Sequence, residues 1–229
     1  MPGQTVSYKA NGGTAEGYLA TAASGKGPGV IVIQEWWGLN DQIKGVADTF
    51  AREGFVALAP DFYHGTGAKI GEPNEAEKLM MDLFQAGTAA KDARGAAQYL
   101  AKHPAVTSKK IGVIGFCMGG GLALLTAAEA PNEIGAVVDC YGVGQDLEGR
   151  ARRIKAPVLG IFGAKDHAMP APLQDVEKGL KASGAPFTKQ VYPQADHAFL
   201  NEQRKDAYRP DDAKDAWSRI MRFLRASLA

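Results

Sequence analysis

Apolar residues along this chain fall into two alternating patterns. Short continuous apolar runs, such as 30–34, are typical of strands that are buried on both faces. Between these runs, apolar side chains recur at helical spacing, and Ile43, Val46 and Phe50 are one example. The predicted strands span residues 5–9, 16–21, 30–34, 55–59, 111–115, 134–140, 156–162 and 187–191. The predicted helices span residues 40–53, 76–85, 88–102, 118–129, 172–182 and 211–227.

The order of these segments predicts an α/β protein. Repeated strand–helix–strand units form a mostly parallel central sheet flanked by helices on both faces. The first two strands are an exception, because Asn11-Gly12-Gly13 between them is a hairpin signal. Segment 64–75 is polar and rich in glycine, with room for an insertion or a lid but not for a domain boundary. We therefore expect residues 1–229 to form a single domain.

Charge and cysteine content exclude several classes of protein. The 26 basic residues nearly balance the 25 acidic ones, which argues against a nucleic-acid partner. Two cysteines, Cys117 and Cys140, make neither a disulfide framework nor a metal-ligand spacing, and we expect no metal. No signal peptide is visible, and no apolar run approaches the ~18 residues of a membrane span. We expect a cytoplasmic protein without a membrane partner.

The segment Gly115-Phe116-Cys117-Met118-Gly119-Gly120 carries the clearest chemical signal. It follows a predicted strand and opens a predicted helix, which is the setting of a nucleophile elbow with the pattern G-x-[S/C]-x-G. The turn is too tight for side chains beside the nucleophile, so Gly115 and Gly119 flank it. Free N–H groups at the helix start stabilise a thiolate or an oxyanion. The alternatives are a buried structural cysteine and a dinucleotide-binding turn, although the latter requires G-x-G-x-x-G.

Partners for Cys117 follow in the order nucleophile, acid, histidine, which is the order of α/β-hydrolases. Asp166 and His197 each lie just after a predicted strand, at the edge where ligands bind in open α/β sheets. His197 would accept the thiol proton, and Asp166 would orient the ring. Asp196 is a poor orienter because adjacent side chains diverge. His167 is the alternative base or a wall of the pocket.

Glu35 follows the strand at 30–34 and precedes Trp36 and Trp37. Its loop is expected to lie across the sheet from Cys117, with the Trp36 N–H as one oxyanion donor and the Met118 N–H as the other. A glutamate beside two tryptophans favours a raised pKa or an unusual role. The alternative is a solvated loop glutamate among surface aromatics.

Together, Glu35, the Cys117 elbow, Asp166 and the segment Pro193-x-x-x-His197-x-Phe199 resemble the dienelactone hydrolase family over nearly the whole chain. The resemblance implies a monomeric, cofactor-free α/β-hydrolase that opens dienelactone to maleylacetate. It implies a triad of Cys117, Asp166 and His197. It also implies that Glu35 holds the resting thiol and takes its proton when substrate arrives.

The chain departs from the family at the residues that hold the substrate carboxylate. Asn201 stands where dienelactone-active members have an arginine four residues beyond the triad histidine. A second family arginine has no clear counterpart, and Lys78 is the nearest cation. Arg204 lies one turn later than Asn201 and is a possible replacement. The identity of the ester or lactone therefore stays open.

From these residues we predict a cysteine-dependent hydrolase that acts on a small ester or lactone through an acyl-enzyme on Cys117. A broad esterase, an acyltransferase and an acyl-binding protein without turnover are the alternatives. Cys140 is expected to be a buried or pocket-edge thiol. Candidate pocket walls are Trp36, Trp37, Phe62, Tyr63, Met169 and Phe199.

Overall fold

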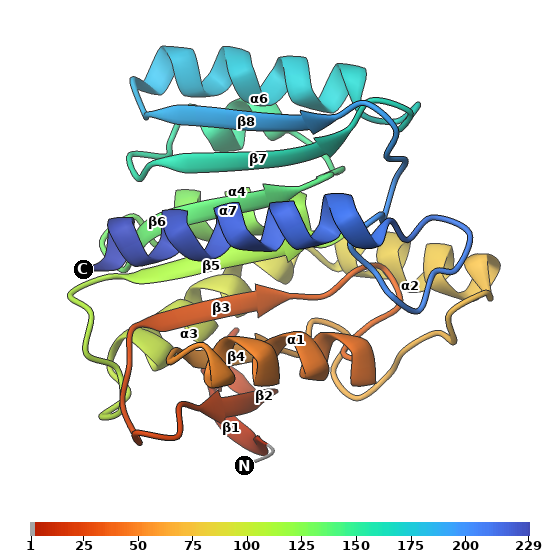
Figure 1. Ribbon diagram of the computed structural model, residues 1–229. Coiled ribbons are helices and arrows are strands. Elements are labelled where there is room, and N and C mark those ends of the chain that lie inside the picture. Colours follow the sequence, from red (N-terminus) through yellow and green to blue (C-terminus); the bar gives the residue numbers. More distant parts are fainter. Residues whose placement is uncertain (1–2) are drawn as a thin grey trace.

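Eight strands form one sheet in the computed structural model, which describes residues 3–229 (Figure 1). Their order is β1-β2-β4-β3-β5-β6-β7-β8. β1 pairs antiparallel with β2 and β2 with β4, whereas all later neighbours are parallel, so the predicted mostly parallel sheet is confirmed. The strands are β1 (Gln4–Ala10), β2 (Gly13–Thr21), β3 (Gly29–Ile33), β4 (Val56–Pro60), β5 (Ile111–Phe116), β6 (Ile134–Cys140), β7 (Val158–Gly163) and β8 (Phe187–Tyr192).

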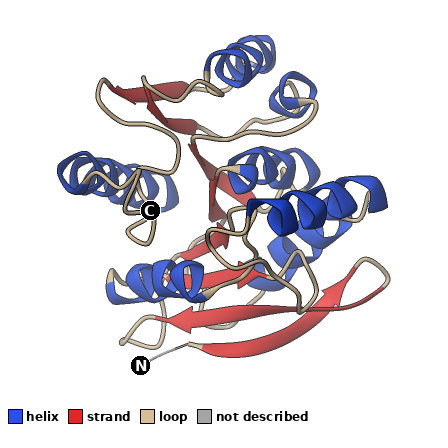
Figure 2. Ribbon diagram, turned by 90° about the vertical axis from the view of Figure 1, so that its right-hand side faces the viewer, coloured by secondary structure: helices blue, strands red, loops and turns tan. Residues whose placement is uncertain are grey.

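Helices cover both faces of this sheet, as predicted. In Figure 1, α1 and α7 lie in front of the sheet while α3 and α4 lie behind it, and the turned view of Figure 2 shows helices on either side of the strands. The helices are α1 (Asp41–Arg52), α2 (Pro73–Ala86), α3 (Ala89–Ala101), α4 (Met118–Glu129), α5 (Leu147–Ala151), α6 (Pro170–Ser183) and α7 (Pro210–Leu228). The α/β fold class is therefore confirmed.

Two stretches differ from the sequence expectation. α2 begins at Pro73 rather than at residue 76, because proline lacks the N–H that the first helical turn leaves unpaired. The predicted loop 64–75 is correspondingly shorter. α5 was not predicted at all, because a helix of five residues is too short to show an apolar period.

The hairpin between β1 and β2 has the expected local chemistry. Ala10 pairs with Gly13, which leaves Asn11 and Gly12 as a two-residue loop. Both residues have positive φ, 51° and 75°. Asparagine and glycine tolerate this conformation best, and a loop with two positive φ values matches the twist of the strands it joins. The hairpin prediction is therefore confirmed.

The central strands β3, β4 and β5 are buried along their whole length, which explains their uninterrupted apolar sequences. Parallel pairing aligns the carboxyl ends of β3, β5 and β6, since Ile33 pairs with Gly115 and Phe116 pairs with Cys140. In Figure 1 these strands all run toward the edge where α2 and the loop before α7 also lie. The segments that follow the strands therefore meet at this edge.

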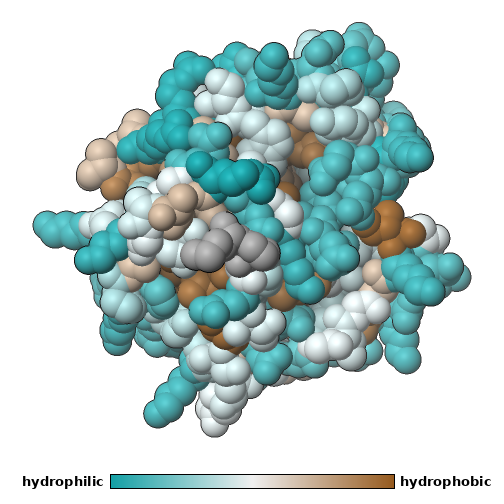
Figure 3. Space-filling view, turned by 60° about the horizontal axis from the view of Figure 1, so that its bottom comes forward, coloured by the Kyte–Doolittle hydropathy of each residue, from teal (hydrophilic) through white to brown (hydrophobic). Residues whose placement is uncertain are grey.

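The surface shown in Figure 3 is mainly hydrophilic, with hydrophobic atoms in small separate areas. Among the described residues, the exposed large hydrophobic side chains are Met81 and Tyr208. None of the helices within residues 3–229 is long and apolar enough to cross a membrane.

Candidate active site

Cys117 occupies a strained turn between β5 and α4. Its backbone lies at φ 57° and ψ −123°, a conformation that costs free energy in a non-glycine residue. A Cβ on Gly115 would lie 1.8 Å from the Gly119 carbonyl oxygen, and a Cβ on Gly119 would lie 2.4 Å from the Gln34 carbonyl oxygen. Both positions therefore require glycine, and the steric interpretation of the elbow is confirmed.

Backbone hydrogen bonds fix this turn to the neighbouring strand. The Cys117 N–H donates to the Cys140 carbonyl at 3.0 Å, and the Val143 N–H donates to the Cys117 carbonyl at 3.1 Å. Cys117 is 9% exposed, whereas Cys140 is fully buried, and both thiols are free. Cys117 thus faces the cavity at the sheet edge, and Cys140 is a buried thiol, one of the two positions expected for it.

His197 and Asp166 form the acid–histidine pair expected from the sequence. The Nδ1 atom of His197 lies 2.7 Å from Oδ2 of Asp166, and the other oxygen of Asp166 accepts the Ala168 N–H at 2.9 Å. The Asp196 carboxylate instead accepts the backbone N–H of His197 at 2.7 Å. Asp166 therefore orients the ring, and Asp196 shapes the loop.

Charged neighbours change the proton affinity of this histidine. Burial by itself lowers the pKa of the His197 imidazole. Hydrogen bonds with Asp166 and Cys117, together with electrostatic interactions with both groups, outweigh burial and raise that pKa to about 10. The arrangement therefore stabilises the imidazolium that forms when His197 takes up a proton.

A cavity of about 390 Å³ brings these groups together. Its lining includes the predicted residues Glu35, Trp36, Cys117, Asp166, His197 and Arg204. His167 also lines it, in agreement with its interpretation as a pocket wall. The remaining lining residues are Met80, Val143, Ala168, Asp196 and Ala198.

The backbone N–H groups of Trp36 and Met118, which the sequence predicts as oxyanion donors, are unpaired in residues 3–229. Within the described residues, neither N–H donates to a protein acceptor. Tyr63 ties the two segments together, since its hydroxyl donates to the Trp36 carbonyl at 3.1 Å and lies 3.4 Å from the Met118 Sδ. Tyr63 is buried and does not line the cavity, so it is not the wall expected from the sequence. Its hydroxyl instead connects the Trp36 and Met118 segments behind the site.

Glu35 is a buried carboxylate and not a solvated loop residue. Its Oε2 accepts the Asn201 amide at 2.8 Å, and its Oε1 accepts the Tyr141 hydroxyl at 3.4 Å. Burial raises the pKa of the Glu35 carboxyl, and the hydrogen bond from Asn201 offsets part of this rise. The family resemblance led us to expect that Glu35 holds the resting thiol. In the described structure, however, no hydrogen bond joins Glu35 to Cys117, and the carboxylate is bonded to Asn201 and Tyr141 instead.

Asn201 is 1% exposed and contacts Glu35 rather than the cavity. Its expected role as a substrate-binding residue is therefore wrong, because its amide is used inside the protein. Arg204 does line the cavity, and it pairs with Asp206 through Nε at 2.9 Å and Nη2 at 2.6 Å. Arg204 is thus the one lysine or arginine among the described residues that line the cavity.

Four other expected wall residues, and the expected cation Lys78, lie elsewhere. Phe62 and Phe199 are packed in the core, at 1% and 0% exposure, because the strand ends beside them are covered. Trp37 packs against Ala68 and Ala76 and reaches only a neighbouring hollow. Lys78 is exposed and Met169 is half-buried, and neither lines the cavity.

Met80 and Tyr141 also lie at the site, although neither is among the site residues predicted from the sequence. Met80 lies on α2, where the helical period points Met80 rather than Lys78 to the cavity. Tyr141 follows β6 at φ 42°, and its ring centroid lies 5.1 Å from that of His197. The signal for Tyr141 was present, since it opens a glycine-flanked segment directly after a strand.

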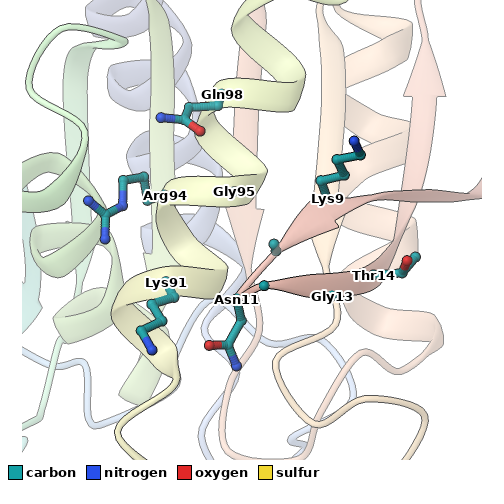
Figure 4. A pocket seen from close by; sticks show the side chains of 10 residues that line it. Lys9, Asn11, Gly13, Thr14, Lys91, Arg94, Gly95 and Gln98 are labelled. Carbon is teal, nitrogen blue, oxygen red and sulfur yellow. The ribbon is translucent and has the colours of Figure 1, made fainter.

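A separate hollow between the β1–β2 hairpin and α3 contains Lys9, Lys91 and Arg94. In Figure 4, Lys9 extends to the opposite side of α3 from Arg94, so these cations do not converge on one point. No group of three potential metal-binding side chains occurs in residues 3–229. The Cys117 cavity is therefore the place where reactive groups converge.

The sheet topology and the arrangement of nucleophile elbow, histidine and acid define an α/β-hydrolase. The family model for the dienelactone hydrolase family matches residues 15–228, and the chain belongs to that family. It is 41% identical to "Protein usf" of Aquifex pyrophilus and 36% identical to the "Putative carboxymethylenebutenolidase" of Aquifex aeolicus, with 99% of each chain covered in both cases. A Klebsiella pneumoniae structure described as a "Putative Dienelactone Hydrolase" superposes with a TM-score of 0.83 at 31% identity, covering 97% of this chain and 98% of that one. The protein is a lactone or ester hydrolase.

Proposed function

We propose that the protein hydrolyses a carboxylic ester or lactone through a covalent acyl-enzyme on Cys117. The sulfur attacks the acyl carbonyl while His197 takes up the thiol proton, and the N–H groups of Trp36 and Met118 bind the oxyanion. The bond to the leaving oxygen then breaks as His197 returns the proton to it. A water molecule, deprotonated by His197, attacks the thioester and releases the acid and the thiol.

The observation that carries this proposal is the convergence of Cys117, His197 and Asp166 on one cavity next to two unpaired backbone N–H groups. Every step needs only these groups and water. An acyl-binding protein without turnover has no need for a histidine–aspartate pair that can activate water. The pair therefore supports hydrolysis over binding alone.

A lactone of the dienelactone type, opened to maleylacetate, is the substrate that we propose first. Several relatives are named as carboxymethylenebutenolidases, and a Bradyrhizobium relative is named as a lactonase. The Arg204 guanidinium is available at the cavity for a substrate carboxylate, although Asp206 competes for it. We therefore expect a weaker preference for acidic substrates than an unpaired arginine would give.

The test is a turnover screen of purified protein on dienelactone, a neutral lactone and a neutral aryl ester. We expect Cys117-dependent turnover of all three, and Arg204→Gln should raise KM for dienelactone much more than for the neutral substrates. Products with added alcohols and thiols separate hydrolysis from acyl transfer. A stoichiometric burst without turnover on every substrate would overturn the proposal.

A further inference from the structure

A second hollow of about 570 Å³ adjoins the Cys117 cavity. The two share Trp36 and Arg204 as lining residues, so these side chains form the partition between them. The outer hollow lies where the loop before α2 meets the loop before α7, at the carboxyl edge of the sheet (Figure 1). An acyl chain that outgrows the Cys117 cavity would reach the outer hollow by passing beside Trp36.

One wall of this outer hollow is apolar. It is made by Trp36, Trp37, Ile70 and Pro73. The two indoles pack edge to face with centroids 5.1 Å apart, and the Ala68 N–H donates to the Trp37 carbonyl at 3.0 Å. This wall is therefore a fixed aromatic surface, which suits an aliphatic chain or a ring.

The opposite wall is polar and open to water. Gln203 and Lys205 are exposed, and the Arg204 guanidinium is largely neutralised by Asp206. Such a wall makes no strong demand on the charge of an occupant, and it lets the end of a chain reach solvent. The hollow is thus suited to an elongated apolar group rather than to a compact acid.

The chemistry at Cys117 indicates which half of an ester would enter. The leaving oxygen must face His197, because that ring returns the proton to it. The acyl group extends away from the leaving oxygen, and Trp36, whose N–H binds the oxyanion, is also the partition of the outer hollow. We infer that the outer hollow is an acyl subsite, which adds esters with longer and more apolar acyl chains to the lactones that the protein hydrolyses. This inference rests on the proposed function.

The experiment compares p-nitrophenyl acetate, butyrate, hexanoate and octanoate, which share one leaving group. For the wild-type protein we expect kcat/KM to rise along the series, by up to roughly fourfold for each CH2 that becomes fully buried. Ile70→Trp fills the outer hollow. It should therefore lower the ratio of kcat/KM for the octanoate ester to kcat/KM for the acetate ester, so that kcat/KM no longer rises along the series. Met81→Trp is the matched control, since Met81 is exposed on α2 and lines neither hollow.

A second readout does not need turnover. The binding of the octanoate ion, the ionised acid product of the longest ester, to Cys117→Ala is measured by calorimetry with and without Ile70→Trp. Weaker binding with Ile70→Trp supports the subsite even if no ester is hydrolysed, a result that would count against the proposed function alone. Cys117-dependent acetate hydrolysis with no gain along the series would overturn the subsite and leave the proposed function standing. An equal effect of Met81→Trp would overturn it as well.

Discussion

The side-chain amide of Asn201 donates to Oε2 of Glu35 at 2.8 Å, across 166 positions of sequence. Both residues are almost fully buried, at 1% and 3% exposure. This bond holds the carboxylate on a buried partner, although Glu35 also lines the cavity. Asn201, which stands where family members carry an arginine, therefore holds the Glu35 carboxylate of the site in this chain.

Loss of the Asn201 amide should destabilise the fold. Asn201→Ala leaves a buried carboxylate oxygen without its donor, and we expect the free energy of unfolding to fall by about 1–3 kcal/mol in denaturant titrations. Tyr141→Phe removes the longer 3.4 Å bond to the same carboxylate and should cost less. The reverse order would mean that Tyr141 is the main anchor of Glu35.

The same bond should affect the reactivity of Cys117. In Asn201→Ala the Glu35 carboxylate is free to turn toward the sulfur, and its negative charge disfavours a thiolate there. Iodoacetamide should therefore label Cys117 more slowly in Asn201→Ala than in the wild type. Adding Glu35→Gln to that variant removes the charge and should restore the rate. Unchanged labelling in all three proteins would show that Glu35 has no influence on the thiol.

The two thiols should differ sharply in their effect on catalysis. Cys117→Ala should lose at least ~10³-fold in kcat, because only oxyanion binding and substrate positioning remain. Cys140→Ala is the natural control, because Cys140 is fully buried and outside the cavity lining, and it should keep most activity. Steady-state kinetics on an aryl ester measure both, and equal activities would place the nucleophile elsewhere.

His197 and His167 both line the cavity, but only His197 is paired with Asp166. His197→Ala should be nearly as inactive as Cys117→Ala because members of a triad act as a unit, whereas His167→Ala should be mild. Removing the sulfur or the carboxylate, by Cys117→Ala or Asp166→Asn, should lower the pKa of His197 from about 10. A titration of the ring protons by NMR measures this shift, and an unchanged pKa would contradict the pairing.

Asp139 predicts a pH dependence of stability. Its carboxylate is fully buried on β6 beside Gly120 and Gly142, and burial raises its pKa from 3.8 to about 7, with only a partial offset from the Gly142 N–H. Between these values the unfolded chain has lost the proton and the folded chain keeps it. The contribution of Asp139 to stability therefore falls as pH rises, by roughly 1.4 kcal/mol per pH unit.

Asp139→Asn cannot titrate, so its stability relative to the wild type should increase between pH 4.5 and 6.5. Denaturant unfolding at several pH values measures the difference between the two proteins, which cancels the titration of all other groups. A constant difference across this range would show that Asp139 titrates with its ordinary pKa in the folded protein.

Much of this molecule follows from local rules that the sequence displays. The apolar runs specify buried strands, and Asn11-Gly12 specifies the hairpin turn, because each depends on neighbouring residues alone. The elbow is equally local, since Gly115 and Gly119 are required by the sterics of a single turn. The order of Cys117, Asp166 and His197 then places them at one edge, because parallel strands end together.

Tertiary structure alone decided which side chains face the cavity. Phe62 and Phe199 follow strands, as pocket residues do, but neighbouring segments cover them and they belong to the core. Asn201 and Arg204 lie one turn apart, yet the first is buried against Glu35 and the second lines the cavity. These outcomes depend on packing between segments that are distant in the sequence, by 166 positions for Asn201 and Glu35, which no local pattern encodes. The sequence therefore determined the reacting groups, whereas the packing of distant loops determined the shape and charge of the space around them.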